Sequence, residues 1–449
     1  MRGLGLVRVA RRLARRGRLR ASGTILVAAW LMCSALHVAA DEASLAAAEA
    51  PSWWLRSRTT GYLFEVEHPS GASIDRFGAY QDFDGAVSGL SGGRFALRAS
   101  GRFADDLFLR EKVTTRSRLY SGHFETRFSR RAVLRAGRQF IQEGPAGLTL
   151  DGLLLTLRPR SQWDLRAWGG GRAPFSREFS IGDWSDDAAW GARAGFVPSR
   201  AFRAVASWSY RERGGRVASR PFGMEVAVAA PMRVWMRGRA AYDTAHEAWE
   251  RADVFAQWSA SRAAPVIAFE FVDRRPAVDA ASYFSRFAVA ERTRLARGSV
   301  RYEHARGFGA EAEYLGSFVE DRTSTRLGGA LLAPLGRVGY SARIGDAGEE
   351  SRWFGELVYR ATRWLSLEAG ATLATYALFE DALDADERDV TTAFGRLRAF
   401  PRHGVGVTLE VQSLDNPEVS EDIRVLAAVD LTAARGPGLI GLDKRGWLP

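Results

Sequence analysis

Residues 131–171, with the sequence RAVLRAGRQFIQEGPAGLTLDGLLLTLRPRSQWDLRAWGGG, decide the fold class. They contain three apolar runs of about ten residues, separated by the Gly- and Pro-bearing residues 141–147 and then by residues 159–161. The pattern predicts three antiparallel strands joined by one longer loop and one tight turn. A transmembrane β-strand needs about 9 to 11 residues, with one face apolar and the other polar. Repetition of this unit along the chain therefore predicts a membrane barrel.

Alternation of apolar and polar residues continues from residue 92 onward, and no helical period competes with it over comparable lengths. Phe202, Ala204, Ala206, Trp208 and Tyr210 alternate with Arg203, Ser207, Ser209 and Arg211. Counting such runs gives about twenty strands, and an N-terminal hairpin with poor alternation would make twenty-two. We predict an all-β transmembrane antiparallel barrel of roughly 18 to 22 strands, with 20 as the best single value.

The connections between the predicted strands alternate in length. Short turns fall at residues 129–131, 159–161, 198–200, 231–233, 261–264, 305–307, 334–336, 362–364 and 401–403. Longer polar links fall at residues 172–186, 212–221, 244–247, 276–292, 346–350, 380–388 and 416–421. Short periplasmic turns and longer external loops are typical of outer-membrane barrels. Residues 172–186 and 276–292 are long enough to fold into the lumen.

The first 40 residues have the layout of a secretory signal peptide. Eight arginines precede an apolar run at residues 24–36, and small residues precede Asp41. We predict cleavage after Ala40, followed by a lead-in at 41–60, a barrel at 61–433 and a tail at 434–449. The leader holds eight of the chain's eleven net positive charges, so the remainder carries only +3. This nearly balanced body gives no reason to expect a nucleic-acid partner.

Cys33 lies inside the apolar run of the leader, and the sequence contains no other cysteine. The mature chain therefore cannot form disulfides or use a cysteine as a nucleophile or metal ligand. Tryptophans fall mostly near the ends of the predicted strands, which suits the aromatic girdle of a membrane barrel, although a packed core would also use them. They are Trp163, Trp168, Trp190, Trp208, Trp249, Trp258, Trp353 and Trp364.

Strand parity places many charged residues on the face opposite the apolar one. The predicted pore-lining residues are Arg94, Arg98, Arg102, Arg203, Arg211, Arg237, Arg239, Arg297, Arg301, Glu311, Glu313, Arg337, Arg343, Glu356, Glu368, Arg396, Arg398 and Glu410. Fixed charges in a narrow lumen set ion selectivity through the local potential. One hypothesis is a water-filled pore with a mild anion preference. The alternative is that these charges pair across neighbouring strands and give little selectivity.

Short motifs in the opening stretch resemble porin-like outer-membrane barrels of Gram-negative bacteria. They are Gly137-Arg138-Gln139, Leu150-Asp151-Gly152-Leu153 and Leu165-Arg166-Ala167-Trp168-Gly169-Gly170. The resemblance covers about a third of the chain and implies a passive channel for small hydrophilic solutes. It identifies no particular solute. Outer-membrane lipid and lipopolysaccharide are the partners that such a location implies.

An enzymatic reading rests mainly on His246, which lies close to Asp243 and Glu247 in a predicted loop. These residues could form a base with its orienting acid or a weak metal site, but a solvated loop histidine is the simpler interpretation. An acidic stretch at residues 381–389 lacks the ordered spacing of a calcium loop. We therefore predict no catalytic residue, metal or cofactor. A barrel enzyme, a surface-binding barrel and a secreted all-β protein remain the alternatives.

Overall fold

The computed structural model describes residues 51–67, 73–106, 116–143, 146–174, 177, 179, 187–261, 264–275, 292–319, 322–346, 348–377, 388–416 and 419–435. The predicted signal peptide and its cleavage site lie outside the described residues. So do the acidic residues 381–387, most of the predicted loops 172–186 and 276–292, and the chain after Arg435.

Almost all of the described chain forms antiparallel β-strands. They are β1 (Ser52–Glu67), β2 (Ser73–Gly89), β3 (Phe95–Asp106), β4 (Arg116–Arg127), β5 (Ala132–Glu143), β6 (Ala146–Leu157), β7 (Trp163–Arg172), β8 (Ala188–Ser199), β9 (Phe202–Arg213), β10 (Arg216–Ser219), β11 (Pro221–Ala230), β12 (Val234–Asp243), β13 (Ala248–Ser259), β14 (Val266–Arg274), β15 (Thr293–Glu303), β16 (Gly309–Val319), β17 (Arg322–Ala333), β18 (Gly336–Gly345), β19 (Glu349–Arg360), β20 (Leu365–Ala377), β21 (Arg388–Arg402), β22 (Val405–Asn416) and β23 (Val419–Arg435). Two single turns, α3 (Leu90–Gly93) and η1 (Pro231–Arg233), lie in connections.

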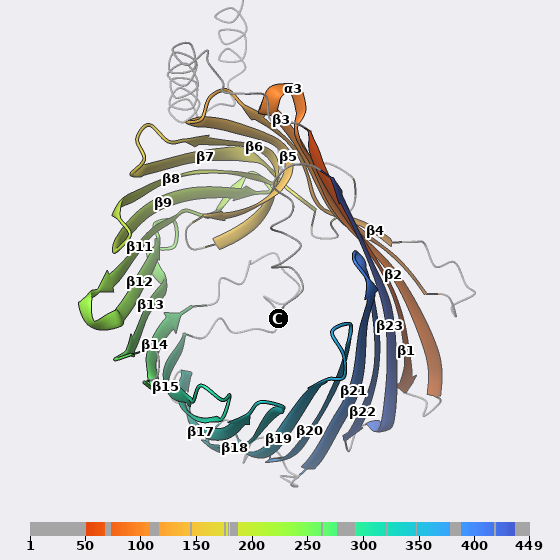
Figure 1. Cartoon of the computed structure of the whole chain (residues 1–449). Coiled ribbons are helices and arrows are strands. Elements are labelled where there is room, and N and C mark those ends of the chain that lie inside the picture. The colour runs from red at the N-terminus through yellow and green to blue at the C-terminus, as the bar shows by residue number, and fades with distance from the viewer. Residues whose placement is uncertain are drawn as a thin grey trace, which may run out of the picture.

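The strands close into a ring, because β1 pairs with β23 as well as with β2. Figure 1 looks into this ring and shows β23 beside β1. The short β10 and the longer β11 both pair with β9 and form one interrupted strand position. The 23 labelled strands therefore make a barrel of 22. The closed antiparallel barrel is as predicted, but the best value of 20 strands is wrong.

The two additional strands are the N-terminal hairpin, whose sequence alternates poorly. Residues of β1 and β2 pair in register from Ser52↔Ser88 to Glu67↔Ser73. On the outward face of this hairpin, the Thr59 hydroxyl donates to Gln81 Oε1 at 2.6 Å, and Gln81 Nε2 donates to the Ser57 hydroxyl at 2.7 Å. These polar residues interrupt the apolar stripe, so hydrophobic periodicity could not identify the strands. β1 begins at Ser52, within the range predicted as a lead-in.

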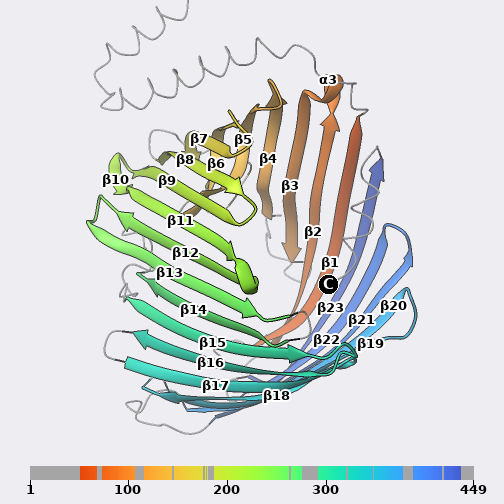
Figure 2. The ribbon, with the colours of Figure 1, turned by 60° about the vertical axis from the view of Figure 1, so that its left-hand side comes forward.

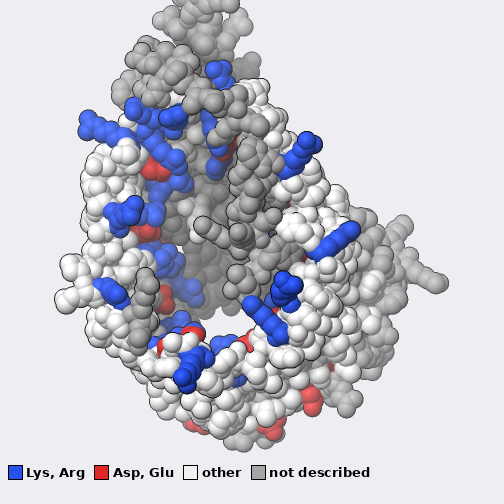
Figure 3. All heavy atoms as spheres, in the orientation of Figure 1, with Lys and Arg blue, Asp and Glu red and all other residues white. Residues whose placement is uncertain are grey.

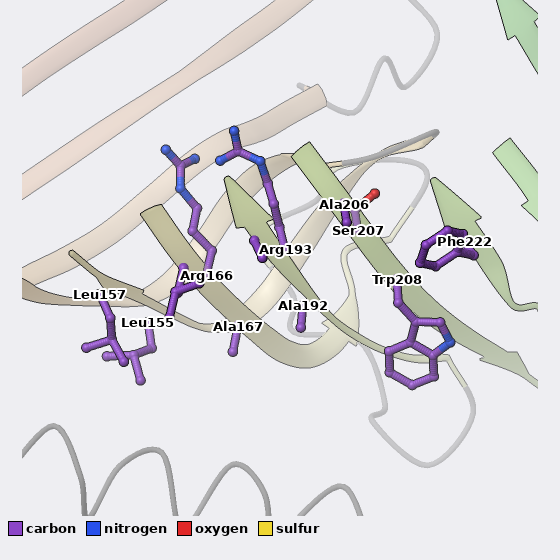
Figure 4. Close-up of a pocket in the computed structure, with 12 residues that line it drawn as sticks. Leu155, Leu157, Arg166, Ala167, Ala192, Arg193, Ala206, Ser207, Trp208 and Phe222 are labelled. Carbon is purple, nitrogen blue, oxygen red and sulfur yellow. The ribbon is translucent and has the colours of Figure 1, made fainter. Parts of the chain in front are cut away.

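The two faces of the wall differ in chemistry. Figure 4 shows Arg166 and Arg193 pointing to one side of β7 and β8, while Leu155, Ala167 and Trp208 point to the other. Large apolar side chains are exposed along the outward face, such as Val254, Phe269 and Leu327 with exposed fractions of 50, 49 and 58%. Because side chains alternate along each strand, this apolar surface comes from every second residue. Figure 2 shows the strands continuing as one curved wall around the ring.

The hairpin of β5 and β6 departs from this regular wall. β4 pairs with β5 only through residues 122–127, whereas β5 and β6 pair along their whole length. Gly137 lies in this seam with φ 123°, and a Cβ there would be 2.3 Å from the Gly122 carbonyl oxygen. Only glycine fits this conformation and close approach. Figure 1 shows β5 bending into the barrel opening.

The bent hairpin buries apolar residues against the inward side of its neighbours. Ile141, Leu148, Leu150 and Leu154 pack with Trp168 and Ala189, and the exposed fraction of Leu150 is 0%. Trp168 is therefore buried inside the barrel, and its assignment to an aromatic girdle is wrong. Trp163, Trp249, Trp258, Trp353 and Trp364 are each at least 39% exposed.

The predicted short turns all coincide with junctions between strands. Neighbouring strands run in opposite directions, so successive connections lie at opposite edges of the barrel. Each predicted short turn follows a strand of the same direction, and all of these turns therefore lie at one edge. The two ends of the described ring, Ser52 and Arg435, lie at this edge as well, since Trp53 pairs with Arg435. Among the described residues, no helix is both long and apolar enough to cross a membrane.

Candidate functional site

The inward face of the barrel carries the residues selected from strand parity, apart from Arg94. Residues in register across neighbouring strands share a face, and one such row passes through Arg237, Glu270, Arg297 and Arg343. Arg94 does not belong to a strand, because it follows α3 in a short connection. Figure 3 shows positive and negative side chains along the inner rim, while the outer wall is mostly uncharged.

On one side of the inward face, arginines lie next to carboxylates and form ion pairs, and we call this side the paired arc. It comprises β20 to β23 and β1 to β3, and seven arginines of these strands have a carboxylate within 4 Å. These arginines are Arg56, Arg58, Arg98, Arg102, Arg396, Arg398 and Arg424. Their carboxylate partners are Asp82, Asp84, Glu368, Glu410, Asp422 and Asp430.

The ion pairs of the paired arc join neighbouring strands, except Arg424–Asp422, which lies within β23. Arg396 on β21 lies between Glu410 on β22 and Glu368 on β20, with Nη1 2.8 Å from Glu368 Oε2. The Arg102 Nε atom on β3 lies 2.6 Å from Asp82 Oδ1 on β2. The arginines of these pairs are partly exposed, while Glu368 and Glu410 are largely buried. Charges of opposite sign cancel locally in each pair. This side of the wall therefore presents little net charge.

A similar network occupies β15 to β19. Glu313 accepts hydrogen bonds from Arg297 and Arg326, with Arg326 Nη2 2.9 Å from Glu313 Oε1. Arg337 lies 3.3 Å from Glu356, and Arg343 lies 3.6 Å from Glu350. Parity analysis identified both members of the pairs Arg297–Glu313 and Arg337–Glu356. It omitted Arg326 and Glu350, although both lie on the same face by register.

The opposite side of the inward face, formed by β7 to β9 and β11 to β13, has unpaired arginines, and we call it the arginine-rich arc. Asp164 contacts Arg166 and Arg193 at 2.8 and 3.0 Å, and Asp253 contacts Arg239 and Arg251. Three further arginines have no carboxylate within 4 Å among the described residues. They are Arg203, Arg211 and Arg237.

Two of these arginines are also poorly satisfied by hydrogen bonds. The Nε and Nη2 atoms of Arg211 are buried without a partner among the described residues, and so is Nε of Arg237. The guanidinium of Arg237 lies 5.7 Å from the centre of the Trp235 ring. These donors keep much of their positive potential, because no carboxylate lies within 4 Å of either guanidinium in the described part of the chain. The arginine-rich arc therefore presents a net positive wall.

The inward hairpin reaches the arginine-rich arc. A recess of about 170 Å³ lies between Gln142 near the end of β5 and residues of β8, β9, β11, β12 and β13. Its polar lining includes Arg193, Arg203, Ser207, Glu225, Arg239 and Arg251. Arg166, Arg193, Arg251 and Gln142 were not among the predicted site residues. Strict alternation on β7, β8 and β13 identifies the first three, but no sequence pattern shows that β5 bends inward.

A buried ion pair supports the bend. Arg138, 3% exposed, donates from Nε and Nη2 to the two carboxylate oxygens of Asp151 at 2.7 Å each. Its Nη1 donates to the Leu119 carbonyl oxygen at 3.3 Å, where β4 no longer pairs with β5. The backbone N–H of Leu119 donates to the Arg177 carbonyl oxygen at 2.7 Å. Arg138 thus fills the seam that the bend of β5 opens in the wall.

His246 and Asp243 contact each other in the connection after β12. His246 Nδ1 lies 2.7 Å from Asp243 Oδ2, and the other carboxylate oxygen accepts the backbone N–H groups of Arg220 and Ala245. The geometry makes Asp243 a turn-stabilising acceptor. No group of three potential metal ligands occurs among the described residues.

Comparisons with known proteins identify no family for the chain. No family model matches the sequence, and no curated protein matches it. The translocation pore of the P pilus usher PapC is similar in structure, with 10% identity, a TM-score of 0.49 and coverage of 85% of this chain and 99% of that one. OccK5 (OpdH) of Pseudomonas aeruginosa has 12% identity, a TM-score of 0.43 and coverage of 87 and 100%. A BenF-like porin of Pseudomonas fluorescens Pf-5 has 9% identity, a TM-score of 0.43 and coverage of 86 and 99%. These values are too low to assign a family.

Proposed function

We propose that the chain is an outer-membrane porin, a passive diffusion channel for small hydrophilic solutes. The observation that carries the proposal is the closed ring of 22 strands with an apolar outward face and a charged inward face. In lipid, every backbone polar group must be satisfied internally, and a closed barrel does so without exposed strand edges. The outward apolar side chains then contact hydrocarbon, with lipid and lipopolysaccharide as the surrounding partners.

The inward face supports a water-filled lumen. Charged side chains such as Arg297, Glu311 and Arg337 remain partly exposed on this face, with side-chain exposures of 50, 30 and 49%. Arginines and carboxylates in a dry interior would be costly to bury. Barrels of about 16 to 18 strands leave an aqueous channel, and about 22 strands enclose a wider lumen, which outer-membrane transporters fill with a plug. We therefore assign the predicted charged residues, except Arg94, to the pore lining.

The unequal pairing of the two arcs supports a mild preference for anions. The paired arc cancels its charges locally, whereas Arg203, Arg211 and Arg237 keep theirs. A potential of a few kT at a wall concentrates counter-ions and excludes ions of like sign. Small anionic solutes would then pass along the arginine-rich arc, where the inward hairpin narrows the lumen.

Planar-bilayer recording of the purified mature protein tests this proposal. We expect stepwise conductance, and in a KCl gradient a reversal potential of the sign that chloride permeation gives. Vesicle swelling with neutral sugars of increasing size would measure the width of the lumen. A folded barrel that neither conducts nor admits any sugar would refute the porin and would favour a barrel enzyme or a surface-binding barrel.

A further inference from the structure

Exposed arginines line one edge of the barrel, and we call this set the basic rim. They stand in the short connections that join β2 to β3, β4 to β5, β6 to β7, β8 to β9, β11 to β12, β15 to β16 and β19 to β20, or, for Arg402, at the last residue of β21 before its short connection to β22. The basic rim consists of Arg94, Arg130, Arg131, Arg158, Arg160, Arg200, Arg233, Arg306, Arg363 and Arg402. Within the described residues of all the short connections, no Asp or Glu occurs.

The opposite edge mixes both signs of charge. There Asp273 lies 2.6 Å from Arg292 and 3.5 Å from Arg294, and Asp346 accepts the backbone N–H of Thr323. His246 lies beside Asp243 in the same set of connections. Arg158 lies 3.4 Å from Asp164 near the start of β7, but the described short connections themselves contain arginines and no acid. This excess of positive charge is a property of one edge, so an overall excess of arginine does not explain it.

Large apolar side chains stand exposed among the arginines of the basic rim. Met232 is 82% exposed in η1, Phe128 42%, Phe308 57%, Leu335 56% and Trp364 50%. A soluble acidic partner would leave these side chains in water around its contact. Apolar and aromatic side chains beside cationic ones are instead suited to the boundary between lipid headgroups and hydrocarbon.

We propose that the basic rim binds the headgroups of anionic phospholipids in the leaflet adjacent to it. Each guanidinium donates hydrogen bonds to phosphate oxygens, and the neighbouring apolar side chains enter the outer part of the acyl layer. The ring places such arginines around its circumference, so the rim collects a collar of phosphatidylglycerol or cardiolipin. The inference rests on the proposed membrane location but not on transport.

The orientation of the barrel determines which leaflet the rim meets. Both ends of the described ring lie at the same edge as the short connections. With the short connections periplasmic, the basic rim faces the inner leaflet of the outer membrane, which is composed of phospholipid. Lipopolysaccharide also carries phosphate, and it would be the ligand if the barrel were inserted the other way. We commit to the phospholipid leaflet.

Tryptophan quenching by brominated lipids tests the collar on the full-length mature protein. The protein is reconstituted into vesicles containing brominated phosphatidylglycerol with unlabelled phosphatidylcholine, and into the reverse mixture. We expect phosphatidylglycerol to be preferred at the protein surface. Replacing rim arginines should lower the preference for phosphatidylglycerol by about fivefold for each arginine removed.

The variant R160Q/R200Q/R233Q removes arginines from three neighbouring short connections. Its matched control is R216Q/R220Q/R275Q, which changes three exposed arginines at the opposite edge. We expect the preference to fall in the first and to remain in the second, and to be kept by R160K/R200K/R233K. Equal quenching by both lipids in the wild-type protein, or equal losses in the variant and the control, would overturn the collar. So would stronger competition by lipopolysaccharide than by phosphatidylglycerol.

Conductance of the same preparations separates this proposal from the porin. A protein that inserts but does not conduct would refute the channel while leaving the lipid preference measurable. A protein whose fluorescence no brominated lipid quenches would show that the barrel does not meet lipid, and the collar would fall with the membrane location. A variant that conducts normally but loses its lipid preference would support the collar alone.

Discussion

The paired arc and the arginine-rich arc are built from the same residue types in the same alternation, yet they differ in how charge is compensated. Seven arginines of the paired arc have carboxylate neighbours. On the arginine-rich arc, the two carboxylates that form salt bridges, Asp164 and Asp253, each hold two arginines of the arc, and three arginines stay unpaired. The inward hairpin of β5 and β6 reaches the second arc. Composition alone therefore does not determine the field at a barrel wall, because cross-strand register decides which charges cancel.

The largest expected effect comes from breaking the ion pair that supports the hairpin. D151N leaves the buried Arg138 without its carboxylate, and loss of one partner from a buried pair costs about 3 to 5 kcal/mol. D84N on the paired arc removes a partner 3.5 Å from a half-exposed Arg98, for which the cost is about 0 to 1 kcal/mol. Urea unfolding in detergent, followed by tryptophan fluorescence, measures both. Equal costs would show that the hairpin adds no special stability on its side of the barrel.

A smaller effect is expected from weakening the apolar packing under the hairpin. L150A removes a fully buried side chain that packs with Trp168, at a cost of about 2 to 5 kcal/mol in the free energy of unfolding. The matched change L426A affects an inward side chain of the paired arc that is only half-buried. It should cost less than L150A in the same unfolding experiment. The reverse order would mean that the hairpin does not pack against the wall.

Charge selectivity should respond to the unpaired arginines. R203Q/R211Q/R237Q removes three uncompensated charges, and each change of one kT in the wall potential alters the local ion concentration about threefold. The ratio of chloride to potassium permeability should fall by about that factor or more, as measured from the reversal potential in a KCl gradient. An unchanged ratio would show that the arginine-rich arc does not set selectivity.

The smallest effect is expected where both members of an ion pair are neutralised together. R102Q/D82N leaves the net charge of the paired arc unchanged, because Arg102 and Asp82 cancel each other. The reversal potential should stay within error of the wild-type value. A shift as large as that of the triple arginine variant would remove the distinction between the two arcs.

Much of the barrel could be predicted from sequence, because successive residues of each strand alternate between the apolar outward face and the charged inward face. From β3 onward the apolar stripe is continuous, and the predicted short turns match the strand junctions. The strands β1 and β2 are hard to predict, because Ser57, Thr59 and Gln81 hydrogen-bond to one another on the outward face, where apolar residues are expected. Local hydrogen bonding of this kind removes the hydrophobic contrast on which periodicity depends.

The inward hairpin could not be predicted by the same reasoning. Residues 137–139 read as ordinary strand, and the bend depends on the close approach of Gly137 to β4 and on the buried ion pair of Arg138 with Asp151 across the hairpin. Trp168 was therefore assigned to the membrane boundary, although it is buried inside. Parity likewise placed Arg94 on a strand, whereas α3 ends the alternation before it. Strand parity gives the face of a residue but not the path of a strand that leaves the ring.

The pairing of β1 with β23 has a consequence for assembly. Arg56 and Asp430, which contact each other across this seam, are 374 positions apart in the chain. The edge of β1 that does not pair with β2 therefore finds its partner only after β23 has been synthesised, and closing so long a loop is slow. Until that moment the nascent protein has two unsatisfied strand edges, which are open to aggregation or to capture by chaperones.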